Sequence, residues 1–211
     1  MFKSIELQQV YKNFTERELF AGLDINFKVG DIHGLIGKSG SGKSTIVNMI
    51  CGFDFPDSGK VLIDGKIAEA QDFKMLRTCT AYVPQNVNII GSGKVRETIQ
   101  SSFEFKTNKA KRPNNEQILM VIKNLGLDES ILESEFKSTS GGEKQRIAIV
   151  IATLLDKQIM IFDEPSSGLD DRSKAIVAAY ISNLRDKIII ISTHDIVLKE
   201  ICTSITDLEQ K

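Results

Sequence analysis

Short runs of apolar residues alternate along the chain with longer stretches in which apolar positions recur at helical spacing. The runs predict strands at 31–36, 59–63, 80–83, 159–162 and 187–191. The stretches between them predict helices at 45–50, 115–125, 143–155 and 172–184. Buried strands that alternate with helices are typical of a largely parallel α/β sheet.

Two regions depart from this alternation. Residues 4–10 and 23–27 predict short antiparallel strands that form a small β layer beside the main sheet. Residues 86–155 contain helical patterns and no convincing strand, which predicts an inserted helical subdomain. We therefore predict a single domain over residues 1–211, with an α/β core at 1–85 and 156–211 that carries the subdomain at 86–155.

The composition is that of an ordinary globular protein, with 41% hydrophobic and 26% charged residues among 211. The net charge of −1 gives no bulk attraction to nucleic acid or to an anionic membrane. One basic cluster, Lys106, Lys109, Lys111 and Arg112, lies in a polar stretch. This setting favours a solvated loop over a lipid or nucleic-acid patch.

Cysteine usage and hydropathy indicate a cytoplasmic protein. Cys51, Cys79 and Cys202 are odd in number, far apart and without metal-ligand spacing, which indicates reduced thiols. The N-terminus lacks the layout of a signal peptide, and apolar runs such as 188–191 are far shorter than the ~18 residues of a membrane span. We therefore expect any membrane role to come through a partner.

Residues 37–44, Gly-Lys-Ser-Gly-Ser-Gly-Lys-Ser, fit the phosphate-loop pattern G-x-x-x-x-G-K-[S/T] at every required position. A predicted strand precedes them and a predicted helix follows, as the motif requires. The glycines allow a tight turn whose N–H groups face a phosphate, and the helix N-terminus adds partial positive charge. Lys43 would reach the β- and γ-phosphates, and the Ser44 hydroxyl would hold Mg²⁺. The alternative, an unrelated glycine-rich turn, does not explain this register, so the sequence predicts nucleoside triphosphate binding.

A second motif, Ile-Met-Ile-Phe-Asp-Glu-Pro at 159–165, delivers two adjacent carboxylates at the end of a buried strand. Ligands of open α/β sheets bind at this end of the strands. Asp163 suits a magnesium ligand, directly or through water. Glu164 points the other way along the pleat and could polarise an attacking water. Taken alone, two acids at a strand end could instead form a structural turn.

The segment 140–146, Ser-Gly-Gly-Glu-Lys-Gln-Arg, resembles the signature sequence of ABC ATPases. Further motifs follow the family's order. Tyr11 resembles the aromatic residue that stacks on adenine, Gln85 is similar to the Q-loop glutamine, and Asp163-Glu164 are similar to the Walker B pair. Residues 167–170 resemble the D-loop and His194 the switch histidine, so that the resemblance covers residues 5–207. It implies a P-loop NTPase core.

Together the motifs and the resemblance assign a complete set of site residues. The catalytic residues implied are Glu164, His194, Gln85 and Lys43. The nucleotide contacts implied are Tyr11, Gly37, Lys38, Ser39, Gly40, Ser41, Gly42, Lys43, Ser44, Thr45, Ser140, Gly141, Gly142 and Asp170. The magnesium ligands implied are Ser44, Gln85 and Asp163.

Two of these residues carry a second interpretation. Ser140 with Glu143 three residues later forms a capping-box pattern, so Ser140 either caps the following helix or contacts a phosphate of ATP held by another subunit. The adjacent glycines favour the phosphate contact because they are poor helix formers. Asp170, as a lone aspartate, suits the N-cap of the helix that follows, whereas the resemblance implies a position at the subunit boundary. The two roles of Ser140 can coexist.

The sequence also departs from the family pattern. Thr139 stands where the family usually has leucine, and Thr98 replaces an asparagine that is usual in exporter-type members. The first change affects packing of the signature segment and not its phosphate donors. The second weakens an assignment to the exporters.

These observations predict an ATP-binding and ATP-hydrolysing subunit that powers a membrane ABC transporter through ATP-dependent dimerisation, with ATP and Mg²⁺ as cofactors. The implied partners are a transmembrane permease subunit in a separate chain and a second ABC subunit, as a homodimer or heterodimer, with no nucleic acid. The implied location is the cytoplasmic face of the membrane. One alternative is a soluble ABC ATPase that acts on nucleic acid or the translation machinery, and another is a small-molecule kinase.

Overall fold

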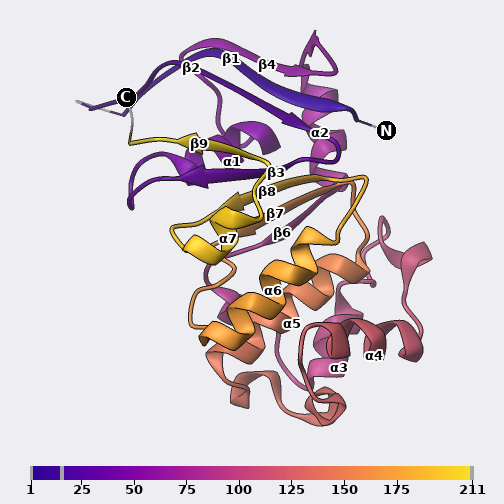
Figure 1. Ribbon diagram of the computed structural model, residues 1–211. Helices are drawn as coiled ribbons and strands as arrows, with labels where there is room; N and C mark the ends of the chain where they lie inside the picture. Colours follow the sequence, from indigo (N-terminus) through magenta and orange to yellow (C-terminus); the bar gives the residue numbers. More distant parts are fainter. Residues whose placement is uncertain (1, 15–16, 210–211) are drawn as a thin grey trace.

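The computed structural model describes residues 2–14 and 17–209 and contains two β-sheets (Figure 1). The antiparallel sheet has the order β2-β1-β4-β5, with strands β1 (Ser4–Phe14), β2 (Arg17–Lys28), β4 (Ser58–Ile63) and β5 (Lys66–Ile67). The parallel sheet has the order β6-β7-β8-β3-β9, with β3 (Ile32–Ile36), β6 (Thr80–Val83), β7 (Ile159–Asp163), β8 (Ile188–Ser192) and β9 (Ser204–Asp207). The predicted α/β class with an antiparallel β layer is confirmed.

Seven α-helices are assigned among the described residues. They are α1 (Lys43–Cys51), α2 (Ala70–Thr78), α3 (Val95–Ser101), α4 (Asn115–Asn124), α5 (Gly141–Leu154), α6 (Asp171–Ser182) and α7 (Ile196–Glu200). Four short 3₁₀ turns join them, η1 (Val87–Ile89), η2 (Lys109–Lys111), η3 (Glu129–Glu133) and η4 (Phe136–Ser138). None of these helices has the length and apolar character needed to cross a bilayer.

The parallel sheet separates two hydrophobic cores, and its central strands contribute to both. Successive side chains of a strand point to opposite faces. In β8, Ile188 and Ile190 join the core formed with α1, α2 and the antiparallel sheet, whereas Ile189 and Ile191 join the core formed with α3 to α6. All five residues of β8 are buried, which explains why this strand is a continuous apolar run and not an alternating pattern.

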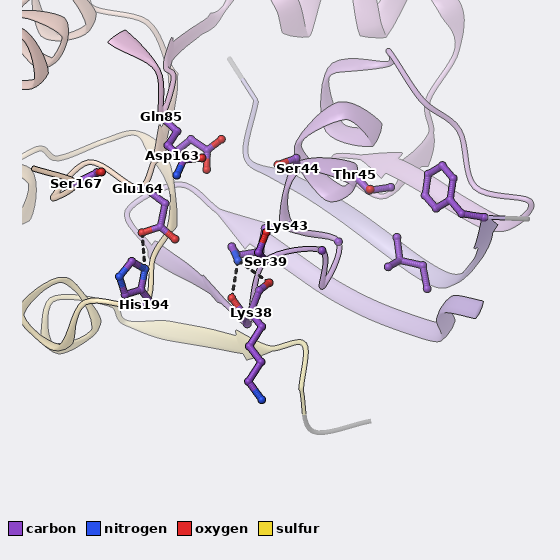
Figure 2. Close-up of a pocket in the computed structure, with 15 residues that line it drawn as sticks. Lys38, Ser39, Lys43, Ser44, Thr45, Gln85, Asp163, Glu164, Ser167 and His194 are labelled. Atoms are coloured by element: carbon purple, nitrogen blue, oxygen red, sulfur yellow. Dashed lines mark hydrogen bonds and ion pairs between the residues drawn. The ribbon is translucent and has the colours of Figure 1, made fainter. Parts of the chain in front are cut away.

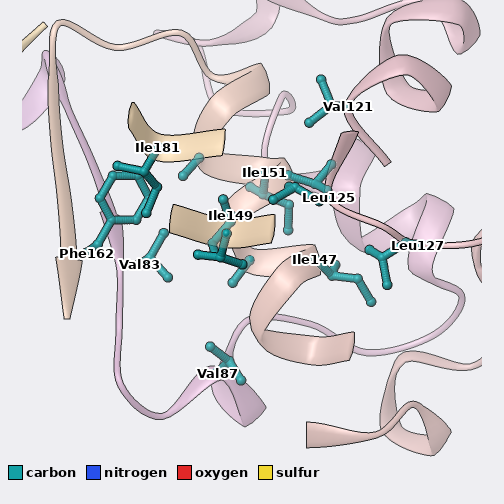
Figure 3. Packing of buried hydrophobic residues seen from close by; sticks show 14 of the residues in the cluster. Val83, Val87, Val121, Leu125, Leu127, Ile147, Ile149, Ile151, Phe162 and Ile181 are labelled. Atoms are coloured by element: carbon teal, nitrogen blue, oxygen red, sulfur yellow. The ribbon is translucent and has the colours of Figure 1, made fainter. Parts of the chain in front are cut away.

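The second core anchors the helical region to the sheet. Residues 147–152 of helix α5 are apolar on all sides of the helix and are buried. Figure 3 shows Ile147, Ile149 and Ile151 of this helix among side chains that come from the sheet and from α4, including Phe162 and Val121. The N-terminus of α5 is therefore held in a fixed place relative to the sheet.

The run at 59–63 belongs to a different sheet from the one predicted. Strand β4 pairs antiparallel with β1, in a register that places Val61 opposite Leu7 and Ile63 opposite Ile5. The apolar run predicted the strand but not its pairing partner, because pairing depends on which strand edge lies next to it in the folded chain. Helix α2 and strand β9 were not predicted from the sequence.

Strand β9 lacks a strand pattern because polar contacts, and not burial, hold it against β3. His33 on β3 makes two hydrogen bonds to β9. Its Nε2 atom lies 2.8 Å from Thr206 Oγ1, and its Nδ1 atom lies 2.8 Å from Ser204 Oγ. The His33 ring also packs edge-on against Phe27 of β2, at 4.7 Å between centroids. Burial lowers the pKa of His33 to about 4, against a smaller opposing effect of Asp31, so the ring is neutral near pH 7.

Candidate active site

A cavity of about 680 Å³ opens where β3 and β7 end, at the carboxyl edge of the parallel sheet (Figure 2). Its walls come from the phosphate loop, the end of β7, the loop after β6 and the loop after β8. The lining residues are Phe14, Leu19, Gly37, Lys38, Ser39, Gly40, Gly42, Lys43, Ser44, Thr45, Gln85, Asp163, Glu164, Ser167 and His194. Phe14 of β1 and Leu19 of β2 add a further wall, so segments that are distant in sequence meet in one cavity.

Gly42, the glycine of the phosphate loop that precedes Lys43, could not be replaced by another residue without strain. Gly42 has φ +104° and caps α1 without a side-chain hydrogen bond. A Cβ at this position would lie 2.4 Å from the Cζ atom of Phe20. The first N–H groups of α1 therefore face the cavity with no side-chain cap, which is the usual arrangement for binding an anion.

Lys43, the first residue of α1, folds back onto this loop. Its ammonium group donates hydrogen bonds to the carbonyl oxygens of Gly37 and Lys38, the second at 3.1 Å. Figure 2 shows both contacts as dashed lines inside the cavity. These contacts keep the ammonium group inside the cavity, where a phosphate of a nucleotide could meet it.

Asp163 ends β7, and both of its carboxylate oxygens accept hydrogen bonds from neighbouring strands. Ser192 Oγ donates to Oδ1, and Tyr82 Oη donates to Oδ2 at 2.9 Å. Burial, followed by the charge of Asp163 and this hydrogen bond, raises the pKa of Tyr82, so the phenol stays protonated as a donor. The orientation of the carboxylate is thereby fixed.

Glu164 follows in a left-handed backbone conformation, with φ +48°. Its N–H donates to the carbonyl oxygen of Ser192 at 2.9 Å, and its side chain lines the cavity. The side chain of Glu164 is 10% exposed, and His194 Nδ1 lies 2.9 Å from its Oε2 atom. Despite this short contact, no described donor is aligned well enough to make a hydrogen bond to Oε2. A buried carboxylate oxygen with unused acceptor capacity is suited to polarise water.

Ser44, Gln85 and Asp163 line the same cavity and supply hydroxyl, amide and carboxylate oxygens. These are the hard ligands that Mg²⁺ prefers. The described residues contain no group of three or more His, Cys, Asp or Glu side chains able to hold a metal by themselves. A cation at this place would therefore also need oxygen ligands from a bound phosphate.

The aromatic wall of the cavity is Phe14 and not Tyr11. The side chain of Tyr11 is directed elsewhere, since a Cβ on Gly22 would meet its Oη at 3.1 Å. Lys12, whose ammonium lies 5.4 Å from the centroid of the Phe14 ring and 2.7 Å from Asp54 Oδ1, supports the phenylalanine. Strand β1 continues to Phe14, four residues beyond the predicted end. A prediction that extended the strand this far would have included Phe14 as a second aromatic candidate beside Tyr11.

The signature segment does not line the cavity. Ser140 caps α5, accepting from the Glu143 N–H at 3.2 Å while Glu143 Oε2 accepts from the Ser140 N–H at 2.7 Å. The capping box predicted from the sequence is confirmed, and the phosphate contact of Ser140, Gly141 and Gly142 stays a prediction.

Asp170 also acts as a helix cap, because it accepts from the Ser173 N–H at 2.7 Å at the start of α6. Hydrogen bonds from Ser173 lower the pKa of Asp170. Ser41 likewise lies outside the main cavity, with a buried hydroxyl that has no hydrogen-bond partner among the described residues. The structure therefore brings together most of the predicted site, and leaves out Tyr11, Ser41, Ser140, Gly141, Gly142 and Asp170.

The chain is similar to known proteins both in sequence and in structure. A family model described as ABC transporter matches residues 20–167. The uncharacterized ABC transporter ATP-binding protein YclH of Bacillus subtilis is 30% identical over 198 residues, which cover 90% of this chain and 87% of YclH. The Nod factor export ATP-binding protein I of Rhizobium etli is 30% identical over 196 residues, and there the match covers 90% of this chain but only 60% of the relative. The dimeric structure of MJ0796, a bacterial ABC transporter cassette, superimposes with a TM-score of 0.78 at 26% identity, covering 96% of this chain and 93% of that one.

Proposed function

The chain belongs to the ABC transporter family as an ATP-binding and ATP-hydrolysing subunit, and from this premise we propose a role for each residue of the cavity. Lys43 and the N–H groups of the phosphate loop hold the β- and γ-phosphates. Phe14 stacks on the base in place of Tyr11. The observation that carries the proposal is the meeting of Lys43, Asp163, Glu164 and His194 in one cavity at the carboxyl edge of the sheet.

Hydrolysis requires a water placed in line with the γ-phosphate, and Glu164 is the group that polarises it. Its Oε2 atom has unused acceptor capacity, and its burial strengthens the interaction with a water proton. His194, 80% exposed and 2.9 Å from the same oxygen, positions the carboxylate and contributes a donor toward the phosphate. Lys43 stabilises the charge that develops on the transferred group.

Magnesium fits the oxygen donors of Ser44, Gln85 and Asp163. When bound with ATP, the ion neutralises negative charge on the phosphates. The hydrogen bonds from Ser192 and Tyr82 hold Asp163 in position to serve as a ligand, a second layer of support that metal sites commonly use. Gln85 leads from the sheet into the helical region through the η1 turn, so it can relay the state of the nucleotide to that region.

A second ABC subunit completes the site in this proposal. Ser140, Gly141 and Gly142 stand at the N-terminus of α5, outside the cavity of their own chain. A helix N-terminus with bare glycines is suited to a phosphate, and the partner subunit's ATP supplies one. The dimeric cassette MJ0796 supports this arrangement. Because the chain carries every motif, a homodimer would contain two complete sites.

A transmembrane permease subunit is the proposed mechanical partner, which places the protein at the cytoplasmic face of a membrane. Phe53, 70% exposed, and Tyr82, 48% exposed, line a second, apolar cavity of about 210 Å³. The hydroxyl group of Tyr82 also donates a hydrogen bond to Asp163, so a single residue connects this surface to a proposed magnesium ligand. An apolar side chain of the permease in this cavity would connect transport to the nucleotide site.

The proposal is tested by an ATPase assay of the purified protein without any phosphoryl acceptor. We expect release of inorganic phosphate that requires Mg²⁺ and stops on chelation. Phosphate transfer only after a small-molecule acceptor is added would indicate a kinase. Salt-dependent binding to nucleic acid would favour the non-transport alternative. Co-purification from detergent extracts would identify the membrane subunit, and its absence from such extracts would contradict the transport role.

A further inference from the structure

The chain after β9 runs beside the phosphate loop. The Leu208 N–H donates to the carbonyl oxygen of Ile36, the last residue of β3, at 2.9 Å. Leu208 is 6% exposed, and a Cβ on Gly37 would lie 3.3 Å from its Cβ atom. The main chain at 208 is therefore fixed against the first residue of the loop, and Glu209 follows directly.

The Glu209 carboxylate contacts Lys38, the second residue of the loop, in two ways. Oε1 accepts the main-chain N–H of Lys38 at 2.7 Å, and Oε2 lies 3.4 Å from its ammonium group. The Lys38 side chain is 86% exposed, so water and salt screen the ion pair. The main-chain contact is the stronger of the two, because a hydrogen bond to an ionised acceptor is about twice as strong as a neutral one.

The peptide unit that contains the Lys38 N–H also supports the catalytic lysine, because its carbonyl oxygen, that of Gly37, accepts a hydrogen bond from the Lys43 ammonium. The carbonyl oxygen of Lys38, in the next peptide unit, accepts the Lys43 ammonium at 3.1 Å and the Ser41 N–H at 3.1 Å. Among the described residues, no side chain other than Glu209 accepts a hydrogen bond from an N–H of residues 37–42. One carboxylate outside the motif thus holds the peptide unit between Gly37 and Lys38, which Lys43 also contacts.

A further cavity, of about 460 Å³, adjoins the loop. Its walls are Glu18, Leu19, Lys38, Ser39, Ser41, Leu208 and Glu209. A glycine-rich turn next to such a space has several accessible conformations, and ordering them costs binding free energy.

We propose that Glu209 is a positioning residue for the phosphate loop, which it holds through the Lys38 N–H in the conformation that receives the β- and γ-phosphates. The inference rests on the proposed role of that loop in ATP binding. The phosphate-loop pattern leaves position 38 open, and Glu209 lies 171 residues away, so no motif identifies the pair.

The test compares Glu209→Ala, Glu209→Gln and, as a control, Glu200→Ala, which removes an exposed carboxylate on α7. ATP affinity is measured by calorimetry, kcat and KM by phosphate release, and hydrogen exchange at 37–42 without nucleotide. We expect Glu209→Ala to raise Kd and KM about tenfold, as for a lost hydrogen bond to a charged group, with kcat changed less than about twofold and faster exchange in the loop. Glu209→Gln should give Kd and KM values between those of the wild type and Glu209→Ala, since its amide oxygen can still accept the Lys38 N–H. Glu200→Ala should match the wild type.

Wild-type ATP affinity and wild-type loop exchange in a folded Glu209→Ala protein would overturn the inference. Tighter ATP binding by that variant would overturn it as well, because the carboxylate would then oppose the nucleotide. Failure of the proposed function has a different signature. In that case the wild-type protein would not bind ATP, while hydrogen exchange without nucleotide would still report whether Glu209 orders the loop.

Discussion

The phosphate-loop side of the site and the signature segment differ in how far a single chain assembles them. On the first side, Lys43, Asp163, Glu164 and His194 line one cavity, with their side chains already held by neighbours. On the second, Ser140 is occupied in a capping box and lies outside that cavity.

The difference follows from where each group stands in the fold. The carboxyl ends of parallel strands converge on one edge of the sheet, so loops that follow β3, β6, β7 and β8 meet without help from another chain. The N-terminus of α5 belongs to the helical region and has no such edge to join. A Cβ on Gly142 would lie 3.3 Å from the Gly168 carbonyl oxygen, whereas Gly141 has open space around it among the described residues. Four substitutions test this contrast.

The largest effect is expected at the signature segment. Ser140→Arg should lower ATPase activity about 10³- to 10⁵-fold, as does loss of a group supplied in trans in other phosphate-loop enzymes, while a single chain still binds ATP. Mixing this protein with Lys43→Ala protein should restore part of the activity, since one site of the mixed dimer has both halves intact. Phosphate release from the mixture is the measurement.

A control separates capping from phosphate contact. Ser140→Asp keeps a good N-cap residue but brings a negative charge toward the phosphate. Full activity in this variant, or a mixture as inactive as its components when heterodimers form, would indicate that Ser140 only caps its own helix or that hydrolysis needs both sites at once. A covalently linked pair with a single Ser140→Arg distinguishes those two outcomes.

Glu164→Gln should slow hydrolysis about 10²- to 10⁴-fold with ATP affinity retained, because the amide keeps the shape and loses the charge that polarises water. The variant should also accumulate an ATP-bound dimer, visible by size-exclusion chromatography with Mg-ATP. Turnover at the wild-type rate would move the catalytic role to another residue, with His194 the next candidate.

Lys43→Ala should weaken ATP binding by about 10- to 100-fold, the loss expected for hydrogen bonds between a charged donor and the phosphates. Calorimetry with ATP checks this, and a melting curve without nucleotide confirms the fold. Affinity equal to the wild type would refute the assignment of the phosphate loop.

The smallest effect distinguishes two aromatic residues. Phe14→Ala should weaken ATP binding about tenfold, within the range for loss of one stacked base, whereas Tyr11→Ala should leave affinity close to the wild type. Tyr11 is three positions away on the same strand and serves as the matched control. The opposite ranking would restore Tyr11 as the stacking residue.

Local sequence patterns were sufficient to predict the structures that depend on neighbouring residues in the sequence. The glycine spacing of 37–44, the apolar run before Asp163 and Glu164 and the Ser140–Glu143 pair each define a structure over a few residues. Each therefore predicted its element correctly: helix α1 after the glycines, strand β7 at Ile159–Asp163 and the cap of α5. The polar strand β9 was missed because its place depends on His33, 171 residues away from Ser204.

The sequence by itself determined the α/β class and the ABC family, because these follow from short-range spacing and from the order of motifs. Only the tertiary structure decided which aromatic faces the cavity, which sheet receives β4, and that Glu209 supports the phosphate loop. Those outcomes depend on where distant segments pass one another. Packing and main-chain hydrogen bonds fix such approaches, and no local pattern along the chain encodes them.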